Sequence, residues 1–228
     1  MSGNMLLIIV VAIAAIALDA SPFTRASDPD KLQDFCVAVK DSEAKVFVNG
    51  KICKNINEVN AGDFYLQAQF NNPRNTSNRL RYMPSPIGAE ILPGLNTQGV
   101  SIGRMDFGPY GMSPPHTHIP ATEVITVLEG TIYAGFIDSR NKLYAKTLRP
   151  GDIFVFPKGL IRFLYNTGGS NAAVFAALGS QDPGAILIPY ALFGTDPPIF
   201  ADVLSKAFLL DKNVISHLQS EFRSELSK

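Results

Sequence analysis

Two histidines and a glutamate stand close together in the segment PPHTHIPATEV, residues 114–124. His116 and His118 are two positions apart, and residues with this spacing point to the same side of a β-strand. A bend after the second histidine would let Glu123 return to the same centre. Two imidazoles and one carboxylate suit a first-row ion such as manganese, iron or zinc. The segment therefore predicts a metal site, and the alternative is a pair of surface histidines on a strand.

A fourth protein ligand is harder to find. The third histidine of the chain, His217, lies near its far end in a segment with helical periodicity, where we expect it on the surface. A three-ligand site completed by water is common among catalytic metal centres. The sequence motif alone therefore leaves the fourth position open.

The elements that must position these residues are mainly β-strands. Short apolar or alternating runs recur over residues 97–190, among them EVITVLEGTIYAGFI, DIFVFP and IRFLYN, and Gly, Pro, Asn or Asp separates most of them. This spacing is typical of a sandwich or small barrel. VLEGTIY predicts a hairpin that turns at Glu129–Gly130.

The period changes to that of helices at about residues 198–226. Asp211 is the expected N-cap between two helices. Each helix has an apolar stripe that must be buried somewhere, and a second copy of the chain is the expected partner. The stripes consist of Val203, Leu204, Ala207 and Phe208, and of Val214, Ile215, Leu218 and Phe222.

The start of the chain carries the pattern of a secretory signal peptide. The apolar run MLLIIVVAIAAIAL is short for a membrane span, and small residues follow it. We predict a signal peptide over residues 1–26, with cleavage after Ala20 or Ala26, and one domain over residues 27–228. An uncleaved membrane anchor is the alternative, and cleavage would leave no membrane contact.

Composition and cysteines fit a single secreted domain. With 46% hydrophobic and 18% charged residues and a formal net charge of zero, the chain offers no basic face for nucleic acid. Cys36 and Cys53 are its two cysteines, and an even count in an oxidising compartment favours a disulfide worth about 3 kcal/mol. Two buried thiols are the alternative. The sequon at Asn75 predicts an exposed glycosylated loop.

Several motifs together resemble the plant germin-like proteins of the cupin superfamily. GPYGMSPPHTHIPATEV resembles the first germin motif, and RPGDIFVFPKGLIRFLYNTG resembles the second. SDPDKLQDFCVAV resembles the start of mature germins, cysteine included, and the segments QDPG, LFGTDPPI and VLSKAFLLD resemble their C-terminal part. The resemblance runs from about Ser27 to Phe222, and the order of the motifs makes it specific.

This resemblance implies a jelly-roll β-barrel with C-terminal α-helices, an apoplastic location and assembly into a homo-hexamer. It also implies one manganese per subunit, with His116, His118 and Glu123 matching three of the family's ligands. The family's fourth ligand is a histidine, and the matching position here holds Arg162.

Arginine at this position opposes metal binding. It has no lone pair to donate and it stays protonated. At about 5 Å a guanidinium and a divalent ion repel by roughly 6–7 kcal/mol if the effective dielectric constant is ~20. Two arrangements remain open. Arg162 pairs with Glu123 across the barrel, or it swings to the barrel mouth and water completes the metal site.

The pattern of the oxalate-oxidising germins also includes two asparagines beside the metal, and the matching positions here hold Gly103 and Ser113. We therefore expect no oxalate oxidase activity. One hypothesis is a cell-wall glycoprotein with a role in defence or wall development. The other is a manganese-dependent superoxide dismutase or oxidase of the cell wall. A nucleotide-sugar phosphatase is not favoured, because no phosphate cradle is apparent.

Overall fold

The computed structural model describes residues 35–39 and 51–226. The predicted signal peptide and its cleavage sites lie outside these residues. The described residues include no helix that is both long and apolar enough to cross a membrane.

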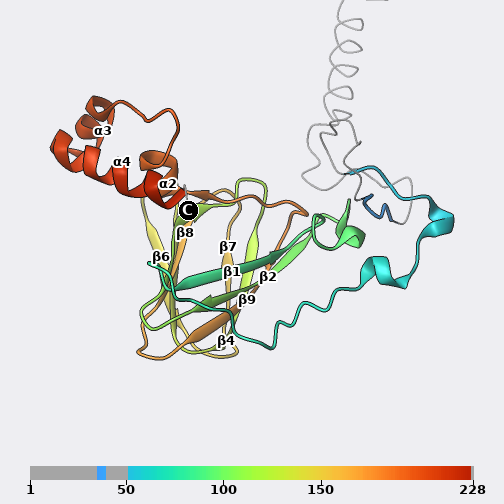
Figure 1. Ribbon diagram of the computed structural model, residues 1–228. Coiled ribbons are helices and arrows are strands. Elements are labelled where there is room, and N and C mark those ends of the chain that lie inside the picture. Colours follow the sequence, from blue (N-terminus) through green and yellow to red (C-terminus); the bar gives the residue numbers. More distant parts are fainter. Residues whose placement is uncertain (1–34, 40–50, 227–228) are drawn as a thin grey trace, which may run out of the picture. The chain divides into compact units, whose positions relative to one another are not determined.

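Within this part of the chain, ten strands form two antiparallel sheets of five strands each (Figure 1). One sheet has the order β1-β2-β9-β4-β7, and the other has the order β10-β3-β8-β5-β6. The strands are β1 (Tyr82–Ile87), β2 (Ser101–Phe107), β3 (Met112–Thr117), β4 (Glu123–Glu129), β5 (Ile132–Ile137), β6 (Leu143–Leu148), β7 (Ile153–Phe156), β8 (Ile161–Asn166), β9 (Ala172–Leu178) and β10 (Ile186–Leu187).

This architecture confirms the predicted mainly β jelly roll. The hairpin between β4 and β5 turns at Gly130, whose φ of +81° lies in the left-handed region that glycine tolerates. The sheets begin earlier than the expected range of residues 97–190, because β1 pairs with β2 along its whole length. Two prolines inside β1 masked its strand pattern, and β1 is an edge strand, where proline is tolerated.

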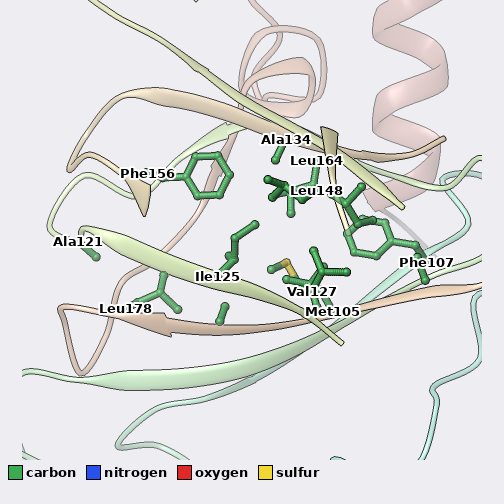
Figure 2. Close-up of a cluster of buried hydrophobic side chains, with 14 residues drawn as sticks. Met105, Phe107, Ala121, Ile125, Val127, Ala134, Leu148, Phe156, Leu164 and Leu178 are labelled. Atoms are coloured by element: carbon green, nitrogen blue, oxygen red, sulfur yellow. The ribbon is translucent and has the colours of Figure 1, made fainter. Parts of the chain in front are cut away.

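The hydrophobic core lies between the inner faces of the two sheets (Figure 2). Strand β4 shows the alternation behind it, since Ile125 and Val127 are buried while Val124 and Leu128 are exposed. The core residues are Met105, Phe107, Ala121, Ile125, Val127, Ile132, Ala134, Leu148, Phe156, Leu164, Ala172, Val174, Ala176 and Leu178.

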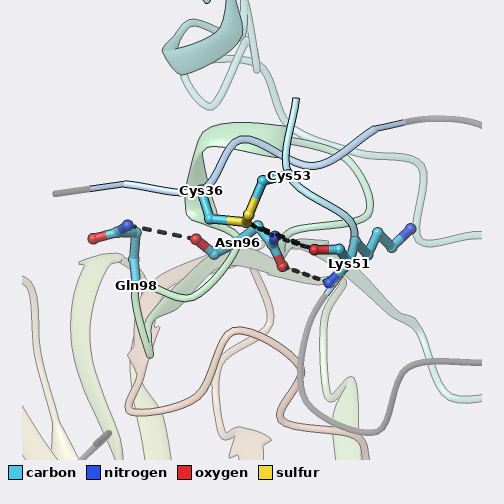
Figure 3. Close-up of a disulfide and its surroundings, with 5 residues drawn as sticks. All are labelled: Cys36, Lys51, Cys53, Asn96 and Gln98. Carbon is cyan, nitrogen blue, oxygen red and sulfur yellow. Dashed lines mark hydrogen bonds between the residues drawn. A yellow bond between two sulfur atoms is a disulfide. The ribbon is translucent and has the colours of Figure 1, made fainter. Parts of the chain in front are cut away.

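A disulfide joins Cys36 to Cys53 near the start of the described chain (Figure 3). The fully buried Asn96 holds the same region in place. Its side chain accepts a hydrogen bond from the Lys51 amide at 3.0 Å and donates one to the Lys51 carbonyl at 2.9 Å. Two short 3-10 helices, η2 (Ile56–Glu58) and η3 (Ala61–Phe64), precede β1, and a third, η4 (Pro93–Leu95), lies between β1 and β2.

The segment before β1 covers part of the outer face of the first sheet. The Phe70 ring packs edge-on against Phe175 with centroids 5.9 Å apart. The Arg104 guanidinium donates to the Phe70 carbonyl at 2.7 Å and also binds Asp106, its neighbour on the same face of β2. These contacts explain why the outward-facing Arg104 and Asp106 are buried.

The helices that follow the barrel are α2 (Ile188–Phe193), α3 (Ala201–Phe208) and α4 (Lys212–Leu226). Helix α4 packs on α2 through Phe222 and Tyr190, whose rings lie 5.0 Å apart. Glu225 links α4 to α2 and to the segment before β1, because it accepts hydrogen bonds from Tyr190 on α2 and from Arg79 before β1. Asp211 is the N-cap of α4, as predicted, and accepts from the Asn213 amide at 2.7 Å.

Candidate metal centre

A β-bulge in β3 sets the position of the first histidine. Pro114 and Pro115 cannot donate to the ladder, and the register between β3 and β8 shifts between Ser113 and His116. Pairing resumes at His116, which lies directly opposite Arg162 on β8. The bulge therefore brings the candidate ligand and the substituted ligand position to neighbouring places inside the barrel.

Both imidazoles are oriented by main-chain carbonyls. The Nδ1 atom of His116 lies 2.8 Å from the Pro114 carbonyl, and the Nδ1 atom of His118 contacts the Gly184 carbonyl. Because a carbonyl can only accept, each Nδ1 carries a proton and each Nε2 keeps its lone pair. A histidine that binds a metal through one nitrogen usually donates to such an acceptor through the other.

Glu123 is the first residue of β4 and lies at the same end of the barrel. One ligand atom each from His116, His118 and Glu123 fall within 4.8 Å of one another. Glu123 is buried and so is His116, whereas His118, which follows the last residue of β3, is half-buried. The structure therefore brings together the three residues that the sequence motif singled out.

Arg162 points into this cluster and binds the carboxylate. Its Nη1 atom donates to the Glu123 Oε2 atom at 3.1 Å, and both side chains are almost completely buried, with exposures of 0% and 3%. Of the two arrangements left open by the sequence, the structure has the ion pair. Arg162 does not swing to the mouth of the barrel.

Three further contacts hold the guanidinium. Its Nη2 atom donates to the Pro157 carbonyl at 2.9 Å, and its Nε atom donates to the Leu160 carbonyl at 3.4 Å. The group also lies over the Phe156 ring, 5.3 Å from the centroid. Arg162 therefore connects β4, β8 and the turn between β7 and β8 from inside the barrel.

The charges of the cluster follow from burial. Burial, together with smaller effects of the nearby His118 and Arg162, lowers the pKa of His116 to about 4, so its imidazole is neutral near pH 7. Burial also lowers the pKa of the Arg162 guanidinium, and the Glu123 charge opposes this shift. Arginine remains protonated in such surroundings.

The positions of the two family asparagines lie on inward-facing sites. Gly103 belongs to β2 and is buried, and Ser113 belongs to β3 and is 2% exposed. Ser113 forms a hydrogen bond with the Tyr82 hydroxyl, and burial, with a smaller effect of Glu123, raises the pKa of Tyr82 to about 12. Neither position supplies an amide to this interior.

The other predicted positions lie away from the cluster. His217 is exposed on α4 and cannot complete the site, as expected from its place in the sequence. Asn75 is exposed in the segment before β1, where its side-chain oxygen accepts from the Ser77 amide.

Sequence reasoning missed the acceptors that surround the site. The carbonyls of Pro157, Leu160 and Gly184 bind Arg162 or His118, and main-chain atoms leave no trace in residue identity. The sequence pattern places Phe156 in a strand, but it does not indicate that its ring contacts Arg162. The motif RPGDIFVFPKGLIRFLYNTG is the signal in the sequence that points to this region.

Comparison with known proteins assigns the chain to a family. A family model described as Cupin matches residues 68–216. Germin-like protein subfamily 1 member 7 of Arabidopsis thaliana is 48% identical over 222 residues, which cover 96% of each chain. Germin-like protein 8-2 of Oryza sativa subsp. japonica is 50% identical over 213 residues, which cover 92% of this chain and 96% of the relative.

Solved structures agree with these relatives. A recombinant oxalate oxidase in complex with glycolate superposes with a TM-score of 0.82 and 40% sequence identity, over 87% of this chain and 99% of that chain. From its jelly-roll barrel, its His–His–Glu cluster and these relatives, we conclude that the chain belongs to the germin-like proteins of the cupin family.

Proposed function

We propose that this chain is a secreted germin-like glycoprotein of the plant cell wall, acting in defence or wall development. In this proposal its barrel binds manganese weakly, because Arg162 holds the carboxylate that the metal needs, and it does not oxidise oxalate. The observation that carries the proposal is the buried ion pair of 3.1 Å between Arg162 and Glu123. The signal-peptide pattern of residues 1–26 and the resemblance to germin-like proteins motivate the proposed location and biological role.

The residues of the cluster supply part of a metal-binding site. His116 and His118 would hold the ion through Nε2, since their Nδ1 atoms donate to carbonyls. Glu123 would have to leave Arg162 or share its carboxylate with it. A bound manganese ion would supply redox cycling, and the protein's own contribution would be to orient two neutral imidazoles in a buried site.

We expect no oxalate oxidation because of the groups beside the cluster. The 40% identical oxalate oxidase is a structural neighbour of this chain. In the family pattern two asparagines stand beside the metal, whereas Gly103 and Ser113 offer no amide here. We expect neither the wild type nor Arg162→His to release hydrogen peroxide from oxalate. Release of peroxide by either protein would contradict this part of the proposal.

The test of the metal site is manganese stoichiometry after dialysis against a mild chelator. Wild type should retain well under one manganese per chain. Arg162→His removes a repelling charge and adds an imidazole on the inward face of β8, so it should retain close to one. Arg140→His is the matched control, because Arg140 is exposed and forms a surface ion pair with Asp138 near the β5–β6 turn. One tightly held manganese per wild-type chain would refute the proposal.

A manganese-dependent superoxide dismutase is the second candidate, favoured by the three retained donors of the cluster. It requires the wild type to bind the metal. Superoxide dismutation that follows manganese content in Arg162→His, but is absent from the wild type, would support the first candidate over the second.

A further inference from the structure

His118 is the one candidate ligand of the cluster that lies outside the strands. His116 lies opposite Arg162 in the ladder between β3 and β8, and Glu123 begins β4 and pairs with both β7 and β9. Strand β3 ends at Thr117, and so does its pairing with β10. Because His118 follows the end of both ladders, other contacts must fix its place, and accurate orientation of a ligand matters for metal binding.

The turn between β7 and β8 supplies one of these contacts. The Gly159 amide donates to the His118 carbonyl at 3.1 Å, and the Ala121 amide reaches the same carbonyl at 3.4 Å from its own loop. In return, the Gly159 carbonyl accepts from the Thr117 hydroxyl at 2.8 Å. Since Gly159 is bound through both its amide and its carbonyl, the turn is fixed in position and direction relative to the end of β3.

The backbone of Gly159 suits this double contact. Its φ of +74° lies in the left-handed region, which glycine adopts without strain. Lack of space is not the reason for a glycine, because the nearest heavy atom to an added Cβ would be the Ile119 carbonyl oxygen, 3.8 Å away. What requires the glycine is the conformation, which directs its amide to His118 and its carbonyl to Thr117.

The imidazole of His118 is held by a different segment. Its Nδ1 atom contacts the carbonyl of Gly184, which lies between β9 and β10, and the hydrogen bond of one ring nitrogen selects the tautomer. His116 differs, because the acceptor of its Nδ1 atom is the Pro114 carbonyl of the same strand. Displacement of the His118 main chain should therefore change the tautomer of His118 and leave that of His116 as it is.

We propose that Thr117 is a positioning residue of the metal centre, which fixes the place of His118 through Gly159. Its side chain lies on the opposite face of β3 from His116, so it does not bind the ion itself. The same turn holds the Arg162 guanidinium through two carbonyls, and one short segment therefore supports both a candidate ligand and the buried cation. The role in metal binding rests on the proposed function, whereas the placement of His118 can be measured without a metal.

Long-range proton–nitrogen NMR on the chelator-treated full chain reads the tautomer of each histidine. At about pH 8, above the ordinary pKa of imidazole, wild-type His118 should be in the Nδ1–H form. Thr117→Val removes the hydroxyl at nearly the same shape and should raise the Nε2–H fraction of His118 by at least about five-fold, whereas Thr117→Ser should keep the wild-type tautomer. Thr147→Val, at an exposed position of β6, is the matched control and should change nothing.

Gly159→Ala is an independent arm, because a Cβ strains the left-handed backbone of the turn and should also raise the Nε2–H fraction of His118. Gly151→Ala is its matched control. Gly151 lies in the turn between β6 and β7, has a φ of +89°, and has nothing within 4 Å of an added Cβ, so the strain is similar but distant from His118. Near-UV circular dichroism checks that each variant is folded.

The inference is overturned if wild-type His118 already mixes both tautomers, or if it keeps the Nδ1–H form in both Thr117→Val and Gly159→Ala. It is also overturned if the controls act as strongly, or if His116 changes together with His118, because the whole barrel would then have loosened.

Manganese stoichiometry tests the role in metal binding. Thr117→Val/Arg162→His should retain less manganese than Arg162→His alone, and equally tight retention by the two chains would refute this role. If Arg162→His itself retains no manganese, the proposed function fails, and the NMR comparison still decides whether Thr117 positions His118.

Discussion

At the scale of single residues, Arg162 and Glu123 depend on each other. Removing two charges from water is costly, and a buried pair is stable only when its remaining hydrogen-bonding atoms are satisfied. Arg162 meets this condition through two carbonyls and an aromatic ring. Loss of one partner would leave the other charged and buried.

Glu123→Gln tests this dependence. Breaking one side of a buried ion pair typically costs about 3–5 kcal/mol, so we expect the free energy of unfolding to fall by about 3 kcal/mol in urea at pH 7. The double variant Glu123→Gln/Arg162→Gln should recover part of that loss. Asp202→Asn is the control, because Asp202 forms an exposed pair with Lys212 and should matter little. If Glu123→Gln and Asp202→Asn lower the free energy of unfolding by equally small amounts, the buried pair contributes nothing to stability.

Much of this site could be predicted from residue types. The spacing of His116, His118 and Glu123 indicated a shared centre, and the family motif identified Arg162 as the substituted position. The choice between an ion pair and an outward arginine depended on the carbonyls of Pro157 and Leu160. Those acceptors exist only once the turn between β7 and β8 is folded, so no sequence pattern could reveal them.

At the scale of elements, the start of α4 is capped by the side chain of Asp211. Asp211→Ala removes the side-chain acceptor of the Asn213 amide and should destabilise α4 by about 1 kcal/mol. Hydrogen exchange should become faster in the first turns of α4 and stay unchanged in β4. Asn213→Ala is the control, since that residue contributes its main-chain amide and its side chain is exposed. Unchanged exchange in α4 would contradict the capping role.

The segment before β1 offers a second element to test. Phe70→Ala removes the ring that packs on Phe175, although the Phe70 carbonyl can still accept from Arg104. We expect faster hydrogen exchange over residues 68–74 without a change in β9. Tyr65→Ala, at an exposed position, should leave exchange in this segment as it is. Equal exchange in wild type and Phe70→Ala would mean that the ring does not hold the segment.

The elements themselves were largely predictable, and the exceptions have physical causes. The alternation in β4 and the helical period after residue 198 both indicated the observed structure. Strand β1 was missed because Pro84 and Pro86 interrupt its pattern. They are tolerated because β1 pairs only with β2, on one edge.

At the scale of the whole molecule, the helical hairpin of α3 and α4 leaves apolar side chains exposed. Leu204 and Ile215 are buried within the chain, so each of the two predicted apolar stripes has one buried residue. Phe200 and Leu209 remain 82% and 90% exposed. We propose that these residues contact a second copy in a homo-oligomer, which the family resemblance suggests is a hexamer.

Light scattering on two altered chains tests this assembly. Truncation after Thr195 removes both helices, and Phe200→Ser/Leu209→Ser keeps them but removes two exposed apolar side chains. Both should lower the mass relative to the wild type or, for the truncated chain, produce aggregates. Lys206→Ser on the same helix is the control and should keep the wild-type mass. An unchanged mass for both altered chains would contradict the proposed interface.

The contacts of Arg162 also have an evolutionary consequence. Of the four groups that hold its guanidinium, two are main-chain carbonyls and one is the Phe156 ring of the core, while the fourth, Glu123, is a residue that a metal centre would already contain. A barrel with a histidine at this position could therefore accept an arginine in one step, without compensating substitutions elsewhere. The reverse step would be equally short. Within such a family, lineages could gain or lose a metal centre repeatedly while the barrel itself stays unchanged.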